Sequence, residues 1–141
     1  MPTENLHITL AFLGQVEAGQ FDAIVAAARS VQAQRFMLRL NDPGYWTHNH
    51  VAWLAAAVVP DELKSMVADL RAALVRSGIG FDPKPFVPHV TLVRNARPPK
   101  EEWPTLNPVE WPVNGFTLVS SERDESGPYY RIAAGPFQAQ P

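Results

Sequence analysis

Two short stretches share one pattern: Leu6-His7-Ile8-Thr9-Leu10 near the start of the chain and Pro88-His89-Val90-Thr91-Leu92 in its second half. Each carries a His-x-Thr pair among apolar residues. Successive side chains of a β-strand point to opposite faces, so residues i and i+2 share a face. Each stretch is therefore predicted to be a strand with an apolar face toward a core. Its other face presents a histidine beside a threonine. A single pair of this kind is common in strands, whereas two copies with matching flanks predict one shared site.

The four side chains suit hydrolysis of a phosphodiester by in-line attack of water. Attack at phosphorus needs a base, the leaving oxygen needs an acid, and the nonbridging oxygens need hydrogen-bond donors. Imidazoles titrate near neutral pH, so His7 and His89 are the candidate acid and base. The hydroxyls of Thr9 and Thr91 are the candidate donors to the nonbridging oxygens. This scheme requires no metal ion and no other cofactor, and the residues alone do not decide which histidine is the acid.

Length and composition limit the class of protein. The chain has 141 residues, which predicts a single domain over 1–141 with a sizeable core. Twelve basic and 14 acidic residues give a net charge of −2, which argues against a protein that coats nucleic acid. An RNA substrate would instead be held at one end. The sequence contains no cysteine, no long apolar run and no secretory signal pattern, so we expect no membrane span and a cytoplasmic location.

Apolar periodicity and turn signals predict the order of the elements. Apolar residues at helical spacing over 17–34 and 61–77 indicate two helices, and Gly78 is the expected stop of the second. The predicted order is a strand at 6–13, a helix at 17–34, a strand at 36–40, a turn at 41–44, a strand at 51–57, a helix at 61–77, a strand at 89–95, an ordered loop at 98–112, and strands at 115–122 and 129–134 joined by a charged turn. This order indicates an α+β fold.

The blocks 5–14 and 86–94 resemble the paired HxTx motifs of the 2H phosphoesterases, and more narrowly the RNA 2′,3′-cyclic phosphodiesterase branch, often labelled 2′-5′ RNA ligase. The resemblance covers nearly the whole chain and includes the closing Gly127-Pro128-Tyr129-Tyr130 stretch. It implies a two-lobed fold, in which two antiparallel sheets with outer helices enclose a central cleft. The two motifs, about 80 residues apart, would belong to lobes related by an approximate repeat.

The resemblance also implies an activity and roles for residues. It implies hydrolysis of a 2′,3′-cyclic phosphate, on RNA ends or nucleotides, to a 2′-phosphate. By this likeness His7 is the acid for the leaving 3′ oxygen and His89 is the base for water. Arg94 stands where the family has an arginine thought to contact the substrate phosphate. Strict alternation puts it on the face opposite His89, so its use in the site requires the strand to end or bulge near Val93.

Several other side chains are weaker candidates. Tyr45 and Trp46 follow the predicted turn, where an aromatic ring can stack on a base of single-stranded RNA, with core packing as the alternative. His48 and His50 have a spacing that suits a metal ion, but no third ligand is evident, so we interpret them as a solvated strand end without a metal site. Tyr130 is interpreted as structural.

The chain departs from the family at its start. Relatives have a further strand and helix before the first motif, and only six residues precede His7 here. An exposed sheet edge invites pairing with another strand, so a homodimer through such an edge is a possible consequence.

Three alternatives to a metal-independent hydrolase remain open. The same site can run in reverse and join RNA ends through a 2′-5′ linkage. A nucleotide-binding module without turnover is a second alternative. A metal-dependent hydrolase using His7, His48, His50 and His89 is a third, and it predicts inhibition by a chelator.

Overall fold

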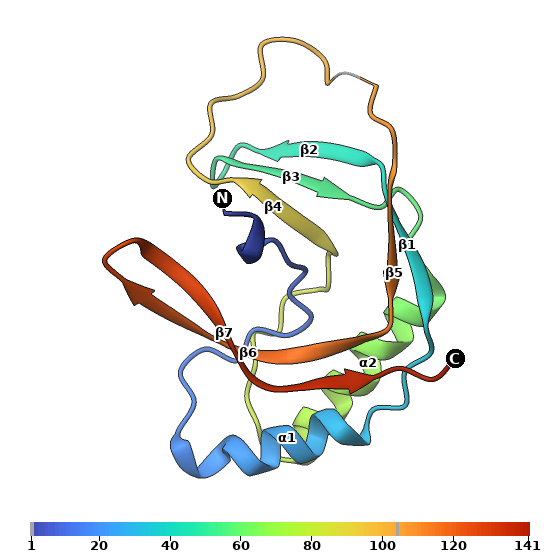
Figure 1. The fold of residues 1–141 in the computed structure, drawn as a ribbon, viewed down its shortest axis with the longest axis vertical. Helices are drawn as coiled ribbons and strands as arrows, with labels where there is room; N and C mark the ends of the chain where they lie inside the picture. Colours follow the sequence, from blue (N-terminus) through green and yellow to red (C-terminus); the bar gives the residue numbers. More distant parts are fainter. Residues whose placement is uncertain (1, 104) are drawn as a thin grey trace.

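The computed structural model describes residues 2–103 and 105–141, and within these ranges it has an α+β fold (Figure 1). The elements in chain order are the 3₁₀ turns Thr3–Asn5 and Ala18–Gln20, α1 (Phe21–Ser30), β1 (Phe36–Leu40), β2 (Asp42–Trp46), β3 (Val51–Ala55), α2 (Asp61–Arg76), β4 (His89–Val93), β5 (Val109–Val113), β6 (Gly115–Asp124) and β7 (Gly127–Gln138). The predicted fold class is confirmed, and all the named strand pairs are antiparallel.

The strands form three hydrogen-bonded groups in place of the two sheets expected. One group has the order β2-β3-β4, a long hairpin pairs β6 with β7, and β1 pairs with β5. Figure 1 shows the three-stranded group and the hairpin on opposite sides of the N-terminal segment, with the β1–β5 pair connecting them at one end. The helices lie on the outside, below the hairpin and behind the β1–β5 pair. Strands from both halves of the chain thus surround the first motif.

Helix α2 links the two parts of the core. It begins after Pro60 with Asp61 and Glu62 in its first turn, where carboxylates are favourable, and Gly78 at φ 72° closes it as predicted. Its first half packs on a cluster that includes Leu38, and its second half packs on a cluster that includes Ile24 of α1. The buried stripe of α2 comprises Leu63, Met66, Val67, Leu70, Ala73 and Leu74.

The prediction of a strand at 6–13 is wrong. This segment belongs to no ladder among the described residues, and only a few of its backbone groups bond to other parts of the chain. The Leu10 carbonyl accepts from the Arg71 guanidinium, and the Phe12 carbonyl accepts from the Asp82 amide. The residue pattern suited a strand, but a strand also needs backbone pairing along a neighbour, and the described residues give this segment no such pairing.

Four further boundaries differ from the sequence prediction. Helix α1 ends at Ser30, because Val31 is extended and carries the chain into β1 while it contacts both core clusters. The predicted turn at 41–44 lies largely within β2, an edge strand that tolerates Pro43. The predicted loop at 98–112 ends in β5, and the hairpin turn is shorter than expected because β6 runs to Asp124. No helix among the described residues is long and apolar enough to span a membrane.

A substitution at Leu38 of β1 would test the packing of the core, since this residue is only 1% exposed. We expect Leu38→Ala to lower the free energy of unfolding by about 2 to 5 kcal/mol, because it removes buried methyl groups and leaves a cavity. Urea denaturation followed by circular dichroism would measure the change. Met37, the next residue, is 52% exposed and gives a matched control. Met37→Ala should change stability by about 0.5 kcal/mol or less, and equal losses from both variants would contradict this description of the core.

Candidate active site

The second motif is a strand, as predicted. In β4, Val90 is buried and Leu92 packs against the same core cluster, so the alternate residues His89 and Thr91 lie on the other face. His89 is paired with Ala55 of β3 and Thr91 with Trp53. The His89 ring also meets Trp46 of β2 edge to face, with the ring centroids 4.6 Å apart and the planes at 70°. Three neighbouring strands therefore position this histidine.

The first motif reaches the same region without a strand. Ile8 and Leu10 pack against the core cluster that contains Val90, so the apolar residues of both motifs share one core. His7 is half-buried, and its ring meets Tyr130 of β7 edge to face, with centroids 4.6 Å apart and planes at 66°. Thr9 is exposed. Each motif histidine therefore rests against one aromatic ring, supplied by a different group of strands.

Both imidazoles are held by the same backbone arrangement. The Nδ1 of His7 lies 2.6 Å from the carbonyl oxygen of Asn5, and the Nδ1 of His89 lies 2.7 Å from that of Val87. A carbonyl can only accept, so Nδ1 carries the hydrogen in both rings. The Nε2 atoms make no hydrogen bond within residues 2–103 and 105–141. In each ring Nε2 is therefore the atom that can accept a proton when neutral or donate one when protonated.

Two tryptophans form the wall beside the second motif. Trp46 and Trp53 have ring centroids 5.5 Å apart, and the indole of Trp53 crosses Gly44 of the adjacent strand. A Cβ atom at position 44 would lie 2.6 Å from Cε2 of Trp53 and nearer still to two other ring atoms, so only glycine fits. The indole Nε1 of Trp53 is buried without a hydrogen-bond partner among the described residues. Gly44 therefore serves this wall and is not part of the predicted turn.

The other predicted site residues occupy different surroundings. Tyr45 alternates with Trp46 along β2, and its hydroxyl donates to the Ala96 carbonyl at 2.8 Å and lies 2.9 Å from Nδ1 of His50. These contacts hold the loop after β4. Arg94 is exposed and follows the last residue of β4, so the strand ends where its predicted use requires. The substrate contacts of Tyr45, Trp46 and Arg94 stay predictions.

His48 and His50 lie in the turn between β2 and β3. The His48 ring is 6.0 Å from that of Trp46, and His50 bonds to Tyr45 as described. Within residues 2–103 and 105–141, no three His, Asp or Glu side chains are arranged to hold a metal ion. His48 therefore lies beside Trp46 of β2, and His50 lies beside Tyr45 of the same strand.

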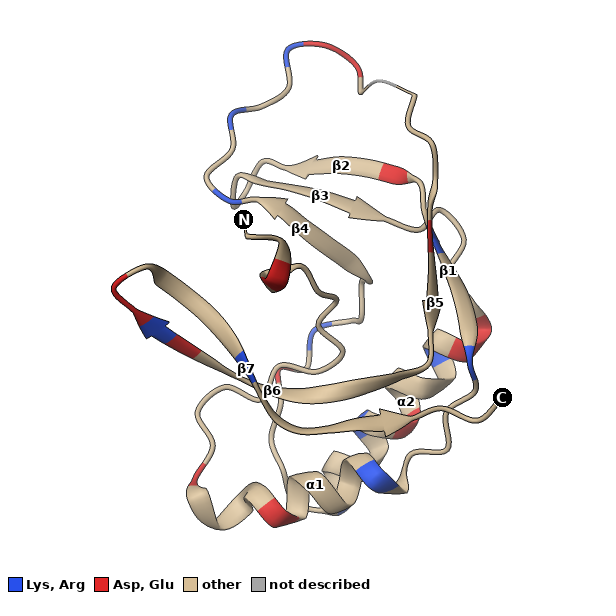
Figure 2. Ribbon diagram, in the orientation of Figure 1, with Lys and Arg blue, Asp and Glu red and all other residues tan. Residues whose placement is uncertain are grey.

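The site region carries few fixed charges. Strands β3 and β4 and the first motif contain no Lys, Arg, Asp or Glu, and Figure 2 shows both strands in tan. The basic residues that follow β4 are Arg94, Arg97 and Lys100, which lie in the exposed loop after this strand. An anionic group beside His89 and Thr91 would therefore meet no carboxylate on these strands, and the loop that follows β4 begins with two arginines, Arg94 and Arg97.

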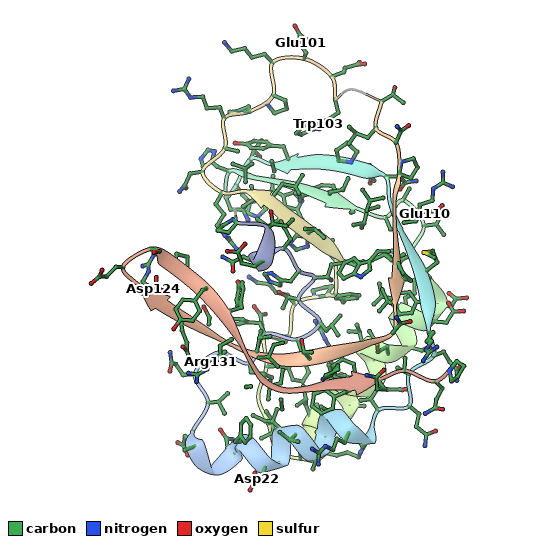
Figure 3. The ribbon with its side chains drawn as sticks, in the orientation of Figure 1. Asp22, Glu101, Trp103, Glu110, Asp124 and Arg131 are labelled. Carbon is green, nitrogen blue, oxygen red and sulfur yellow. The ribbon has the colours of Figure 1, made fainter. Side chains whose placement is uncertain are left out.

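A separate polar cluster lies on the β6–β7 hairpin, on the face opposite to that of Tyr130. Tyr129 donates to Glu122 at 2.7 Å, and Arg131 lies 3.5 Å from the same carboxylate. The hydrogen bond from Tyr129 lowers the pKa of Glu122, and the same bond raises the pKa of Tyr129. Figure 3 labels Asp124 near the tip of this hairpin and Arg131 on β7. Because Tyr129 and Tyr130 alternate, this cluster faces away from His7.

Two residues beside His7 were not predicted to belong to the site. Tyr130 was interpreted as structural, yet its ring contacts the imidazole. Asn5 received no role, although it precedes the first motif and is 5% exposed. A buried asparagine normally has a hydrogen-bond partner, so burial would have pointed to it, but burial is not visible in the sequence.

Comparison with solved structures gives the class of protein. LigT from Escherichia coli, in its apo form, superposes with a TM-score of 0.80 at 33% sequence identity, covering 95% of this chain and 76% of LigT. A protein described as a phosphoesterase superposes with a TM-score of 0.78 at 34% identity, covering 92% and 75% of the two chains. At these identities the architecture is that of the 2H phosphoesterases, as the sequence predicts.

The chain belongs to the 2′-5′ RNA ligase superfamily, whose family model matches residues 2–125. The RNA 2′,3′-cyclic phosphodiesterase of Escherichia coli K12 is 36% identical over 124 residues, which cover 84% of this chain and 67% of that protein. The enzyme of the same name from Thermus thermophilus is 33% identical over 142 residues, covering 94% and 71%. The chain thus spans about two thirds of the length of these relatives.

Proposed function

We propose that this protein is a metal-independent phosphodiesterase that hydrolyses 2′,3′-cyclic phosphates on RNA ends or nucleotides. The observation that carries the proposal is the matched presentation of two imidazoles, each donating from Nδ1 to a backbone carbonyl and each leaving Nε2 free. Two such groups provide one base and one acid for a single displacement at phosphorus. The relatives named RNA 2′,3′-cyclic phosphodiesterase support the choice of substrate.

The proposed reaction assigns a role to each motif residue. Neutral His89 accepts a proton from water through Nε2 as the water oxygen bonds to phosphorus. Protonated His7 donates its Nε2 proton to the 3′ oxygen as the bond from phosphorus to that oxygen breaks. The product is a 2′-phosphate with a free 3′-hydroxyl, and the histidines have exchanged protonation states. Thr9 and Thr91 donate to the nonbridging oxygens as negative charge builds there.

The surroundings of the second motif support a nucleotide-sized ligand. Trp46 and Trp53 provide aromatic surface beside His89, and aromatic rings stack on bases without strong sequence preference. Structures of Escherichia coli LigT with 3′-AMP and with ATP are among those that match this chain. We infer that Trp46 contacts the base and that Arg94 contacts a phosphate. RNA is made and processed inside cells, so this substrate also favours a cytoplasmic location.

Joining of RNA ends is a second candidate, favoured by the description of the family as 2′-5′ RNA ligases. In this reaction a 5′-hydroxyl of RNA takes the place of water as the attacking group: it gives its proton to His89 and bonds to phosphorus, while the bond from phosphorus to the 3′ oxygen breaks and His7 protonates that oxygen. Water at high concentration favours hydrolysis, so we rank ligation below it.

The test is incubation of the purified protein with a nucleoside 2′,3′-cyclic phosphate in the presence of EDTA, with the product isomer identified by phosphorus NMR. We expect steady turnover to the 2′-phosphate alone. Activity that requires added metal would contradict the proposal, and so would a 3′-phosphate product. Binding of the nucleotide without turnover would establish the nucleotide-binding module instead. A parallel incubation with RNA carrying cyclic phosphate and 5′-hydroxyl ends would reveal any ligation.

A further inference from the structure

The two motifs differ in how the carbonyl that holds each histidine is itself fixed. Asn5 and Val87 occupy the same place, two residues before His7 and His89. Asn5 is 5% exposed, whereas Val87 is 56% exposed and has no polar side-chain atom. Both imidazoles therefore donate to a backbone carbonyl, but only the carbonyl of the first motif belongs to a buried residue with a polar side chain.

The side chain of Asn5 is tied to the hairpin. Its Nδ2 donates to the carbonyl oxygen of Pro128 at 3.2 Å, across 123 residues of sequence. Pro128 lies at the start of β7, two residues before Tyr130, whose ring packs on His7. Asn5, His7, Tyr130 and Pro128 therefore form a closed set of contacts. Because the first motif belongs to no strand ladder among the described residues, the hydrogen bond from the Asn5 amide fixes this segment to the β6–β7 hairpin.

We propose that Asn5 is a positioning residue for His7. Its buried amide fixes the position of its own carbonyl, this carbonyl holds the Nδ1 hydrogen of the imidazole, and Nε2 is thereby presented for proton transfer. Asn5 contacts no reacting atom in this scheme. The role deepens the proposed function and rests on it for the effect on rate, whereas the effect on the His7 ring does not depend on the substrate.

The best variant is Asn5→Asp, because it keeps the shape and removes the amide donor. Asn5→Ala is a second variant, which removes the side chain without adding a charge. Val58→Ala is the control, since Val58 is 81% exposed and lies outside the site. Each variant is compared with wild type by thermal unfolding, by nitrogen-15 NMR of the histidine rings, and by steady-state hydrolysis of a nucleoside 2′,3′-cyclic phosphate.

We expect both Asn5 variants to lower kcat by about 10- to 100-fold with little change in KM, as is usual when the partner that orients a reacting group is lost. The ring signals of His7 should change from one fixed tautomer to a mixture, while those of His89 stay unchanged. Val58→Ala should alter neither kcat nor either ring.

Two results would overturn the assignment. One is full activity in Asn5→Asp with an unchanged His7 tautomer. The other is an equal change at His7 and His89, which would give Asn5 a general role in folding. If wild type shows no turnover but the His7 ring still loses its fixed tautomer in the variants, the proposed function fails and the positioning role stands.

Discussion

Replacing either His7 or His89 with alanine is expected to lower kcat for cyclic phosphate hydrolysis by about 10² to 10⁴-fold, since each substitution removes one of the two proton-transfer groups. The double variant should lose little more than the worse single variant, because acid and base act in one displacement. Steady-state kinetics with a nucleoside 2′,3′-cyclic phosphate would measure the loss. Thermal unfolding of the same samples would establish that the fold is retained.

His48→Ala is the matched control, because His48 lies in the exposed turn between β2 and β3 and has no role in the proposed proton transfers. We expect it to retain activity near that of wild type. A loss as large as that of His89→Ala, together with inhibition by EDTA, would contradict the two-histidine scheme and favour a metal-dependent reaction. A loss at only one motif histidine would mean that the other is not the acid or base.

The residue patterns predict which side chains belong to the site better than they predict the backbone structure that carries these side chains. His89-Val90-Thr91 is a strand because its alternation agrees with its surroundings, with Val90 in the core and both polar residues on the other face. The same alternation at His7-Ile8-Thr9 puts Ile8 in the core but forms no strand, since a ladder depends on a neighbour that local sequence does not specify. The division into two lobes related by an approximate repeat stays a prediction.

The errors in the predicted elements have a common physical origin in long-range contacts. Pro43-Gly44 is a frequent turn signal, yet here it lies in an edge strand, because β3 pairs with it and Trp53 needs the space at Gly44. Trp111-Pro112 lies in a segment rich in proline, yet it pairs with β1. Among the described residues β5 has no second neighbour that would need the missing amide hydrogen. The amide contact of Asn5 with Pro128 spans most of the chain, so no local pattern reveals it.

Gly44→Ala is expected to destabilise the protein strongly, although it adds only a single methyl group. The new Cβ would overlap the indole of Trp53, and neither the backbone of β2 nor a ring packed against Trp46 can move freely. We expect a loss of about 1 to 3 kcal/mol in the free energy of unfolding, as is usual for overpacking. Activity should fall as well, because Trp53 lies opposite Thr91 and displacement of Trp46 would move the ring that contacts His89. Urea denaturation and steady-state kinetics would measure the two effects.

A double-mutant cycle with Trp53→Leu separates this steric conflict from a general intolerance of alanine in β2. Leucine lacks the ring atoms that meet the new methyl group, so Gly44→Ala should cost much less stability in the Trp53→Leu background than in wild type, with a coupling of about 0.5 to 3 kcal/mol. Gly19→Ala is the control for the methyl group itself, since a Cβ at that position would meet nothing within 4 Å. Equal costs of Gly44→Ala in both backgrounds would mean that Trp53 does not lie across Gly44. The tryptophan wall beside the second motif would then need a different description.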